Sequence, residues 1–156
     1  MDAVPAFDRR FFRSDAVFSR IGDGSLGGKA EGLIRIHDAL VEQLHGRVDG
    51  IEVGIPRVVV IATDAFDRFM EENALYELAL SDAPDDRIAH AFQRADLPTK
   101  VLGDLRSVAA EVQRPLAIRS SSMLEDALEQ PFAGVYETKM IPNNQPDADA
   151  RYHRLV

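Results

Sequence analysis

Apolar residues change their spacing several times along the chain, and each spacing predicts a different element. After Gly28 they recur at steps of three and four residues, which is typical of one face of an amphipathic helix. That face consists of Leu33, Ile36, Leu40 and Leu44. Glycines then interrupt the stretch 45–54 and predict a loop. The β-branched run at 57–63 follows, and it predicts a buried strand that leads into a second helix.

The middle of the chain predicts several helices with recognisable starts. Thr63 can cap the helix that Phe66 and Phe69 indicate. Pro84 and Pro98 stand where the first turns of two further helices are expected, because proline fits the beginning of a helix. The second of these helices has an apolar face formed by Val101, Leu102, Leu105, Val108, Ala109 and Val112. We expect both helices to be core scaffolding.

The last third of the chain combines short strands with polar residues. The stretch 115–126 indicates a strand that ends in an arginine and three serines, and 130–142 indicates another strand. Helical spacing returns at 146–156 and stops on an open apolar stripe, so we expect a truncated domain. Strands and helices alternate, which predicts a mixed α/β class of the α+β type.

The composition predicts one globular domain, because 46% of the residues are hydrophobic and 28% are charged. Residues 1–20 have no clean period, and we expect them to form a surface segment or an edge strand. The domain itself is expected to span 21–156.

The charge and the cysteine count exclude several classes of function. The formal net charge of −8 argues against a nucleic-acid surface, which needs clustered lysine and arginine. The chain has no cysteine, and this excludes disulfides, thiolate catalysis and cysteine-ligated metals. No apolar run has the length of a signal peptide or a membrane span, so we expect a cytoplasmic protein without a membrane partner.

The stretch GDGSLGGKAEG, at 22–32, is the first candidate for phosphate binding. Glycine lets backbone N–H groups approach an anion closely, and the helix that follows offers the positive end of its dipole. The stretch does not match the P-loop of nucleoside triphosphatases, because Asp23 stands at its first glycine and Ala30 at its hydroxyl position. The dinucleotide fingerprint does match, with Gly22, Gly24 and Gly27 as its three glycines. However, Asp64, the acid after the next strand, lies well beyond the expected spacing of about 20 residues.

The second candidate is IRSSS, at 118–122. An arginine that leaves the end of a strand can bind phosphate oxygens through two parallel N–H donors. Serines in such a turn also serve as ordinary caps, so the stretch alone does not establish a phosphate site.

Taken in order, GGKAEGL, VVVIATDAFDRF, LAIRSSSMLED and PFAGVYET resemble one family. The chain is similar to the N-terminal ATP-binding domain of phosphoenolpyruvate synthase and pyruvate phosphate dikinase, over about residues 22–138. The resemblance implies an ATP-grasp fold, of which this chain supplies the first lobe. It departs from the family pattern in its first block and at Val58 and Val135, which leaves room for a divergent or regulatory homologue.

The resemblance also implies which residues bind ATP. Lys29 and Arg119 would hold phosphate oxygens, and Gly134 and Thr138 would lie near the nucleotide. Ser120 and Ser121 are plausible supporting donors, although serines here can equally end the strand. We assign no catalytic residue within this chain.

The family reaction passes a phosphoryl group from ATP to a histidine on a separate domain, which carries it to pyruvate or another acceptor. The expected partners are therefore ATP and the remaining lobe, phosphohistidine and acceptor domains of a longer protein. The four histidines of this chain lack the expected motif and receive no role. Glu125 and Asp126 are better explained as capping or exposed acids, so the ligands of Mg²⁺ are expected outside this chain. Two alternatives remain, namely a dinucleotide-binding module and a non-catalytic interaction domain.

Overall fold

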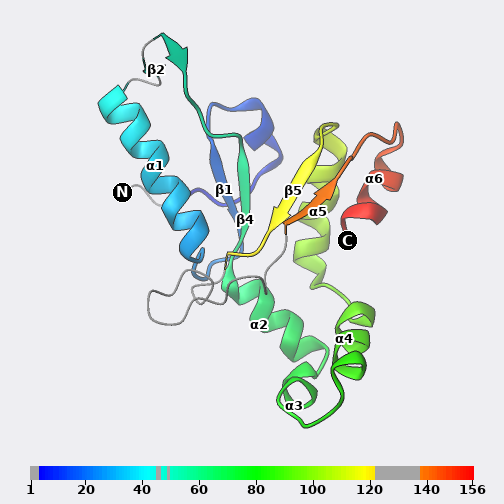
Figure 1. Cartoon of the computed structure of the whole chain (residues 1–156). Helices are drawn as coiled ribbons and strands as arrows, with labels where there is room; N and C mark the ends of the chain where they lie inside the picture. Colours follow the sequence, from blue (N-terminus) through cyan, green and yellow to red (C-terminus); the bar gives the residue numbers. More distant parts are fainter. Residues whose placement is uncertain (1–3, 45–46, 49, 122–137) are drawn as a thin grey trace.

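The computed structural model describes residues 4–44, 47–48, 50–121 and 138–156, which form a mixed α+β fold (Figure 1). Its strands are β1 (Phe18–Ile21), β2 (Arg47–Val48), β3 (Ile51–Glu52), β4 (Val58–Ile61), β5 (Leu116–Arg119) and β6 (Thr138–Ile141). A 3-10 helix, η1 (Arg9–Arg13), precedes them. The α-helices are α1 (Gly28–Leu44), α2 (Thr63–Glu72), α3 (Leu75–Ala79), α4 (Asp85–Arg94), α5 (Thr99–Glu111) and α6 (Ala148–Leu155).

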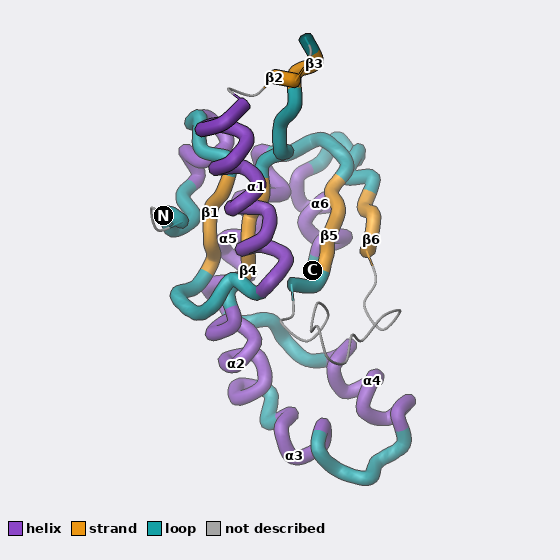
Figure 2. Tube along the Cα trace, turned by 60° about the vertical axis from the view of Figure 1, so that its left-hand side comes forward, coloured by secondary structure: helices purple, strands orange, loops and turns teal. Residues whose placement is uncertain are grey.

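Strands β1 and β4 form a parallel pair, and α1 lies in the connection between them. Helices α1 and α5 cover opposite faces of this pair (Figure 2). On one face the ring of Phe18 meets the ring of His37 on α1 edge to face, at 5.5 Å between centroids. On the other face Ile21 packs with Val101 of α5 and Ala65 of α2, all three buried. The alternation of side chains along β1 thus joins both helices to one short strand.

Strands β5 and β6 form a separate antiparallel pair, in which Arg119 is the partner of Thr138. Helix α6 packs against α5 through Arg151, whose side chain is almost completely buried. Its Nε donates to the carbonyl of Ala109 at 2.8 Å, and its Nη1 donates to the carbonyls of Gln145 and Pro146. Because the last carbonyls of a helix have no partner within it, Arg151 satisfies the end of α5 from outside.

Helices α2, α3 and α4 extend away from the strands as an arm (Figure 1). Phe69 on α2 and Phe92 on α4 lie with their ring centroids 6.0 Å apart. The side chain of Asn73 exchanges two hydrogen bonds with the backbone of Asp96, which joins the end of α2 to the segment before α5. Leu75 is the buried residue of α3, whereas none of the residues of α4 is buried.

Several sequence predictions are confirmed by these elements. The helix after Gly28, the strand in 57–63, the strand ending at Arg119 and the helix in 146–156 are all present. The strand predicted over 130–142 is present at Thr138–Ile141, and the rest of that stretch lies outside the described residues. Helix α5 buries Val101, Val108 and Ala109, members of its predicted face.

Other predictions are wrong. The stretch 45–54, predicted as a loop, contains the short antiparallel pair β2 and β3. Ile36 is 53% exposed, because the buried face of α1 turns instead toward Ala30 and Ile34. Helix α4 buries no side chain and is not core scaffolding. By contrast, the edge strand expected in the first 20 residues agrees with β1, which begins at Phe18 and pairs with β4 in a two-stranded sheet, and Phe11 and Phe18 are buried.

Candidate functional site

Three strand ends converge on the glycine stretch. Strand β1 leads directly into residues 22–27, and β4 leads into the first turn of α2. The carboxyl end of β5 points to the same region, where α1 begins (Figure 1). In open α/β structures the carboxyl ends of strands are where ligands bind. We call residues 22–27 the glycine loop.

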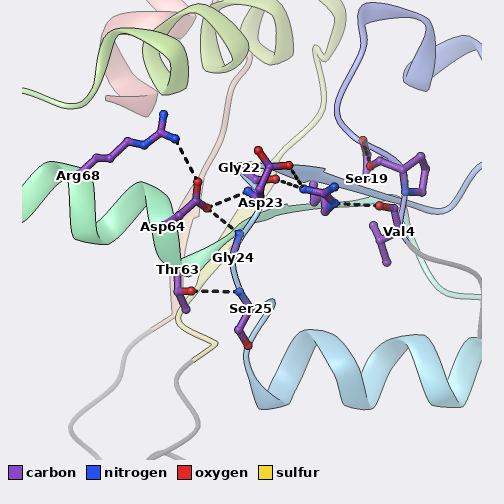
Figure 3. A network of polar contacts seen from close by, with 11 residues as sticks. Val4, Ser19, Gly22, Asp23, Gly24, Ser25, Thr63, Asp64 and Arg68 are labelled. Atoms are coloured by element: carbon purple, nitrogen blue, oxygen red, sulfur yellow. Dashed lines mark hydrogen bonds and ion pairs between the residues drawn. The ribbon is translucent and has the colours of Figure 1, made fainter.

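The first half of the glycine loop is attached to the start of α2 (Figure 3). Asp64 Oδ1 accepts hydrogen bonds from the backbone N–H groups of Asp23 and Gly24, both at 2.9 Å. Thr63 Oγ1 accepts a third from the N–H of Ser25 at 3.0 Å, and the N–H of Thr63 donates in return to the Ser25 carbonyl. Thr63 was predicted to cap α2, but the N-cap is Ala62 and the Thr63 side chain serves the loop instead.

This close approach explains two of the glycines. A Cβ atom on Gly22 would lie 2.3 Å from Asp64 Oδ1, and the φ of Gly22 is +95°. A Cβ atom on Gly24 would lie 2.5 Å from Thr63 Oγ1. Glycine is therefore required at both positions by contacts within the protein.

Ser121 joins the second half of the loop to the end of β5. Its hydroxyl donates to the carbonyl of Leu26 at 3.0 Å and accepts from the N–H of Ala30 at 3.0 Å. The backbones of Gly27 and Ser121 also approach each other closely, since a Cβ atom on Gly27 would lie 1.6 Å from the Ser121 carbonyl oxygen. The N–H of Ala30 belongs to the first turn of α1, where helices lack internal acceptors. Ser121 thus caps α1 from a distant part of the chain.

Arg20, near the end of β1, also contacts the loop. Its guanidinium donates to the carbonyls of Val4 and Gly22 and forms an ion pair with Asp23 at 2.6 Å. The hydrogen bond to Val4 ties the loop to the segment that precedes η1.

The carboxylates of Asp23 and Asp64 are stabilised by hydrogen-bond donors and arginines around the loop. The N–H of Gly24 is the main cause of a pKa of Asp64 below its usual 3.8, an effect that burial opposes and the N–H of Asp23 reinforces. Asp64 Oδ2 also lies 3.7 Å from Arg68 Nη2, one turn along α2. Hydrogen bonding and charge from Arg20 lower the pKa of Asp23 in the same direction. Both carboxylates therefore remain ionised at neutral pH.

The structure locates five of the six predicted nucleotide-binding residues. Lys29 is the second residue of α1 and is half-buried, directly before Ala30. Arg119 is the exposed last residue of β5, and Thr138 stands opposite it as the first residue of β6. Ser120 and Ser121 follow Arg119 and are half-buried. Gly134 lies outside the described residues, as do Glu125 and Asp126.

The contacts of Ser121 bring the two candidate phosphate motifs side by side. They link the start of α1, which carries Lys29, to the end of β5, which carries Arg119. Sequence reasoning missed Thr63 and Asp64 as residues of this site. The available signal was their position directly after a β-branched strand, at the start of a helix.

The described part of the chain has no cluster of potential metal ligands. No group of three or more His, Asp or Glu side chains within it is arranged to hold a metal ion. A depression of about 590 Å³ lies between η1 and α5, with Phe7 and Gly103 in its walls. Burial raises the pKa of Asp104, which also lines it. This depression is formed by elements other than the glycine loop.

Comparison with known proteins gives one family. The sequence model described as pyruvate phosphate dikinase, AMP/ATP-binding domain, matches residues 23–155. No curated protein and no solved structure matches the chain. Among the described helices, none is both long and apolar enough to cross a membrane.

Proposed function

The chain belongs to the AMP/ATP-binding domain family of pyruvate phosphate dikinase, and from this membership we propose that it binds ATP where the glycine loop meets the end of β5. One observation carries the location of the site. The Ser121 hydroxyl bridges Leu26 and Ala30, so the segments that carry Lys29 and Arg119 adjoin.

The two cations suit a triphosphate. Lys29 supplies a compact charge in the first turn of α1, where the helix dipole also favours an anion. Arg119 supplies a planar pair of donors and is exposed, and no described residue forms an ion pair with it. The contacts of Ser121 place the segments that carry these two cations next to each other, which supports a phosphate position between them.

Other residues complete the proposed site. Thr138 pairs with Arg119 across β5 and β6, so it would lie near the nucleotide, and its hydroxyl can donate to a phosphate or ribose oxygen. Gly134 lies before it in the same block of sequence and would allow close approach of the backbone. Ser120 remains a candidate donor. Ser121 donates its single O–H to Leu26, so it acts on the site by holding the loop.

Within the family reaction, this domain would be the first lobe of an ATP-grasp unit spanning 21–156. The phosphoryl group would pass from ATP to a histidine on another domain and then to pyruvate or another acceptor. Lys29 and Arg119 would stabilise the charge that gathers on the phosphate oxygens during transfer. As the family resemblance implies, the ligands of Mg²⁺ would lie outside this chain.

The dinucleotide alternative is weakened because N–H groups of the glycine loop already have acceptors within the protein. A pyrophosphate bound in the fingerprint manner needs free N–H groups in the glycine loop. The N–H groups of Asp23, Gly24 and Ser25 are already bound by Asp64 and Thr63. Gly22 and Gly24 are also explained by contacts within the protein.

Calorimetric titration of the purified chain with ATP and with NAD⁺ tests the proposal. We expect ATP to bind and NAD⁺ to give no saturable heat at the same concentrations. A preference for NAD⁺ would favour the dinucleotide module. Binding of neither would favour the non-catalytic interaction domain and overturn the proposed function.

A further inference from the structure

We propose that Asp64 is the positioning residue of the nucleotide site, holding the first half of the glycine loop as a built-in anion so that phosphate meets only the second half. This inference rests on the proposed function for its ligand, ATP. Its structural part, the control of the loop by Asp64, stands on contacts within the chain.

The N–H groups of Asp23 and Gly24 both point to one oxygen, Asp64 Oδ1, at 2.9 Å (Figure 3). Successive N–H groups converging on one point, next to a residue with positive φ such as Gly22, make a typical anion-binding concavity. Here the anion is a side chain of the protein itself. A phosphate could enter this half of the loop only by displacing Asp64.

Asp64 is not the N-cap of its own helix. The N-cap of α2 is Ala62, whose methyl group cannot accept a hydrogen bond. Thr63 and Asp64, the first two residues of α2, instead direct their side-chain oxygens to the loop. The two-way backbone and side-chain contact between Thr63 and Ser25 reinforces this attachment.

The consequence is a loop that is positioned before any nucleotide arrives. A loop held in its binding conformation loses less conformational entropy when the ligand binds. The second half of the loop, next to Lys29, is held by Ser121 and stays adjacent to Arg119. Two N–H donors and Arg68 stabilise the negative charge of Asp64, which reduces its repulsion of a neighbouring phosphate.

Two substitutions separate the oxygen of Asp64 from its charge. Asp64→Asn keeps a carbonyl oxygen that can accept from both N–H groups, whereas Asp64→Ala removes the acceptor. Glu72→Ala is the matched control, because Glu72 is an exposed acid on the same helix.

Amide hydrogen exchange, followed by NMR on each chain without nucleotide, tests the structural part. We expect the amides of Asp23 and Gly24 to exchange at least tenfold faster in Asp64→Ala, and the amide of Val108 in the core to stay unchanged. Asp64→Asn and Glu72→Ala should keep both rates near those of the wild type. Unchanged exchange at Asp23 and Gly24 in Asp64→Ala would overturn the positioning role.

Calorimetric titration with ATP and with adenosine tests the link to phosphate. We expect Asp64→Ala to bind ATP at least tenfold more weakly and adenosine with unchanged affinity, and Asp64→Asn to recover most of the ATP affinity. Equal losses for ATP and adenosine, or no loss, would overturn the proposal. A wild-type chain that fails to bind ATP would overturn the proposed function, and hydrogen exchange would still decide whether Asp64 holds the loop.

Discussion

The hydroxyl of Ser121 accepts a hydrogen bond of 3.0 Å from the backbone N–H of Ala30, which lies 91 positions earlier in the chain. The same hydroxyl donates to Leu26, on the other side of Gly27. One small side chain thus connects the end of β5 to both the glycine loop and the first turn of α1.

Ser121→Ala should destabilise the domain by about 1–2 kcal/mol, because the Leu26 carbonyl and the Ala30 N–H both lose a partner. Ser107→Ala is the control, since the Ser107 hydroxyl is exposed and donates to Gly103 within its own helix. We expect the control to stay within about 0.5 kcal/mol of the wild type. Urea unfolding measures the free energy of unfolding of both variants. Equal stabilities for the two variants would contradict the bridging role of Ser121.

Two glycines of the same stretch should respond to alanine in opposite directions. Gly27 has a φ of +79°, and its Cβ would overlap the Ser121 backbone, so Gly27→Ala should cost more than about 2 kcal/mol. Gly32 lies inside α1 with open space around its Cβ position. Gly32→Ala should therefore stabilise the chain by about 0.5–1 kcal/mol. Thermal unfolding of both variants checks the signs, and destabilisation by both would refute this reading of the loop.

The local elements were predictable because their signals are local. The β-branched run of β4 and the face of α5 need only their own residues to be recognised. The role of Asp64 was not predictable in this way. Its spacing was judged against a dinucleotide acid, whereas its contacts depend on the parallel pairing of β1 with β4, which places the start of α2 beside the glycine loop.

Lys29 and Arg119 were chosen from the sequence by motif and resemblance, and the structure adds the physical link through Ser121. Arg151 shows the opposite case. A charged residue in a short polar helix is expected to be solvent-exposed, because nothing in the sequence indicates that the last carbonyls of α5 will provide its acceptors.

Arg151→Ala should destabilise the fold by about 2–4 kcal/mol, because several buried carbonyls lose a charged donor. Arg154, exposed on the same helix, provides the control. We expect Arg154→Ala to change the free energy of unfolding by less than about 0.5 kcal/mol. Urea unfolding with both variants tests this, and a similarly small effect at Arg151 would show that α6 docks without it.

Acid should remove the contribution of the Asp64 carboxylate to stability. Its folded-state pKa is lowered, so its stabilisation is present above the usual value of 3.8 and is lost as pH falls through the lower folded-state pKa. The stability difference between wild type and Asp64→Asn should therefore shrink below about pH 4. Urea unfolding of both chains from pH 7 to pH 3 measures it. A difference that stays constant to the lowest pH would contradict the sign of this shift.

The most direct test of the ATP site is calorimetric titration of ATP into Lys29→Ala, Arg119→Ala and Arg87→Ala. Arg87 lies on α4, away from the glycine loop, and is the control for loss of one positive charge. Removing either charge-assisted contact should weaken ATP binding by about 1.5–3 kcal/mol, which is roughly a tenfold to hundredfold rise in Kd. The account predicts this loss for Lys29→Ala and for Arg119→Ala, and wild-type affinity for Arg87→Ala. Wild-type ATP affinity in both site variants would contradict it.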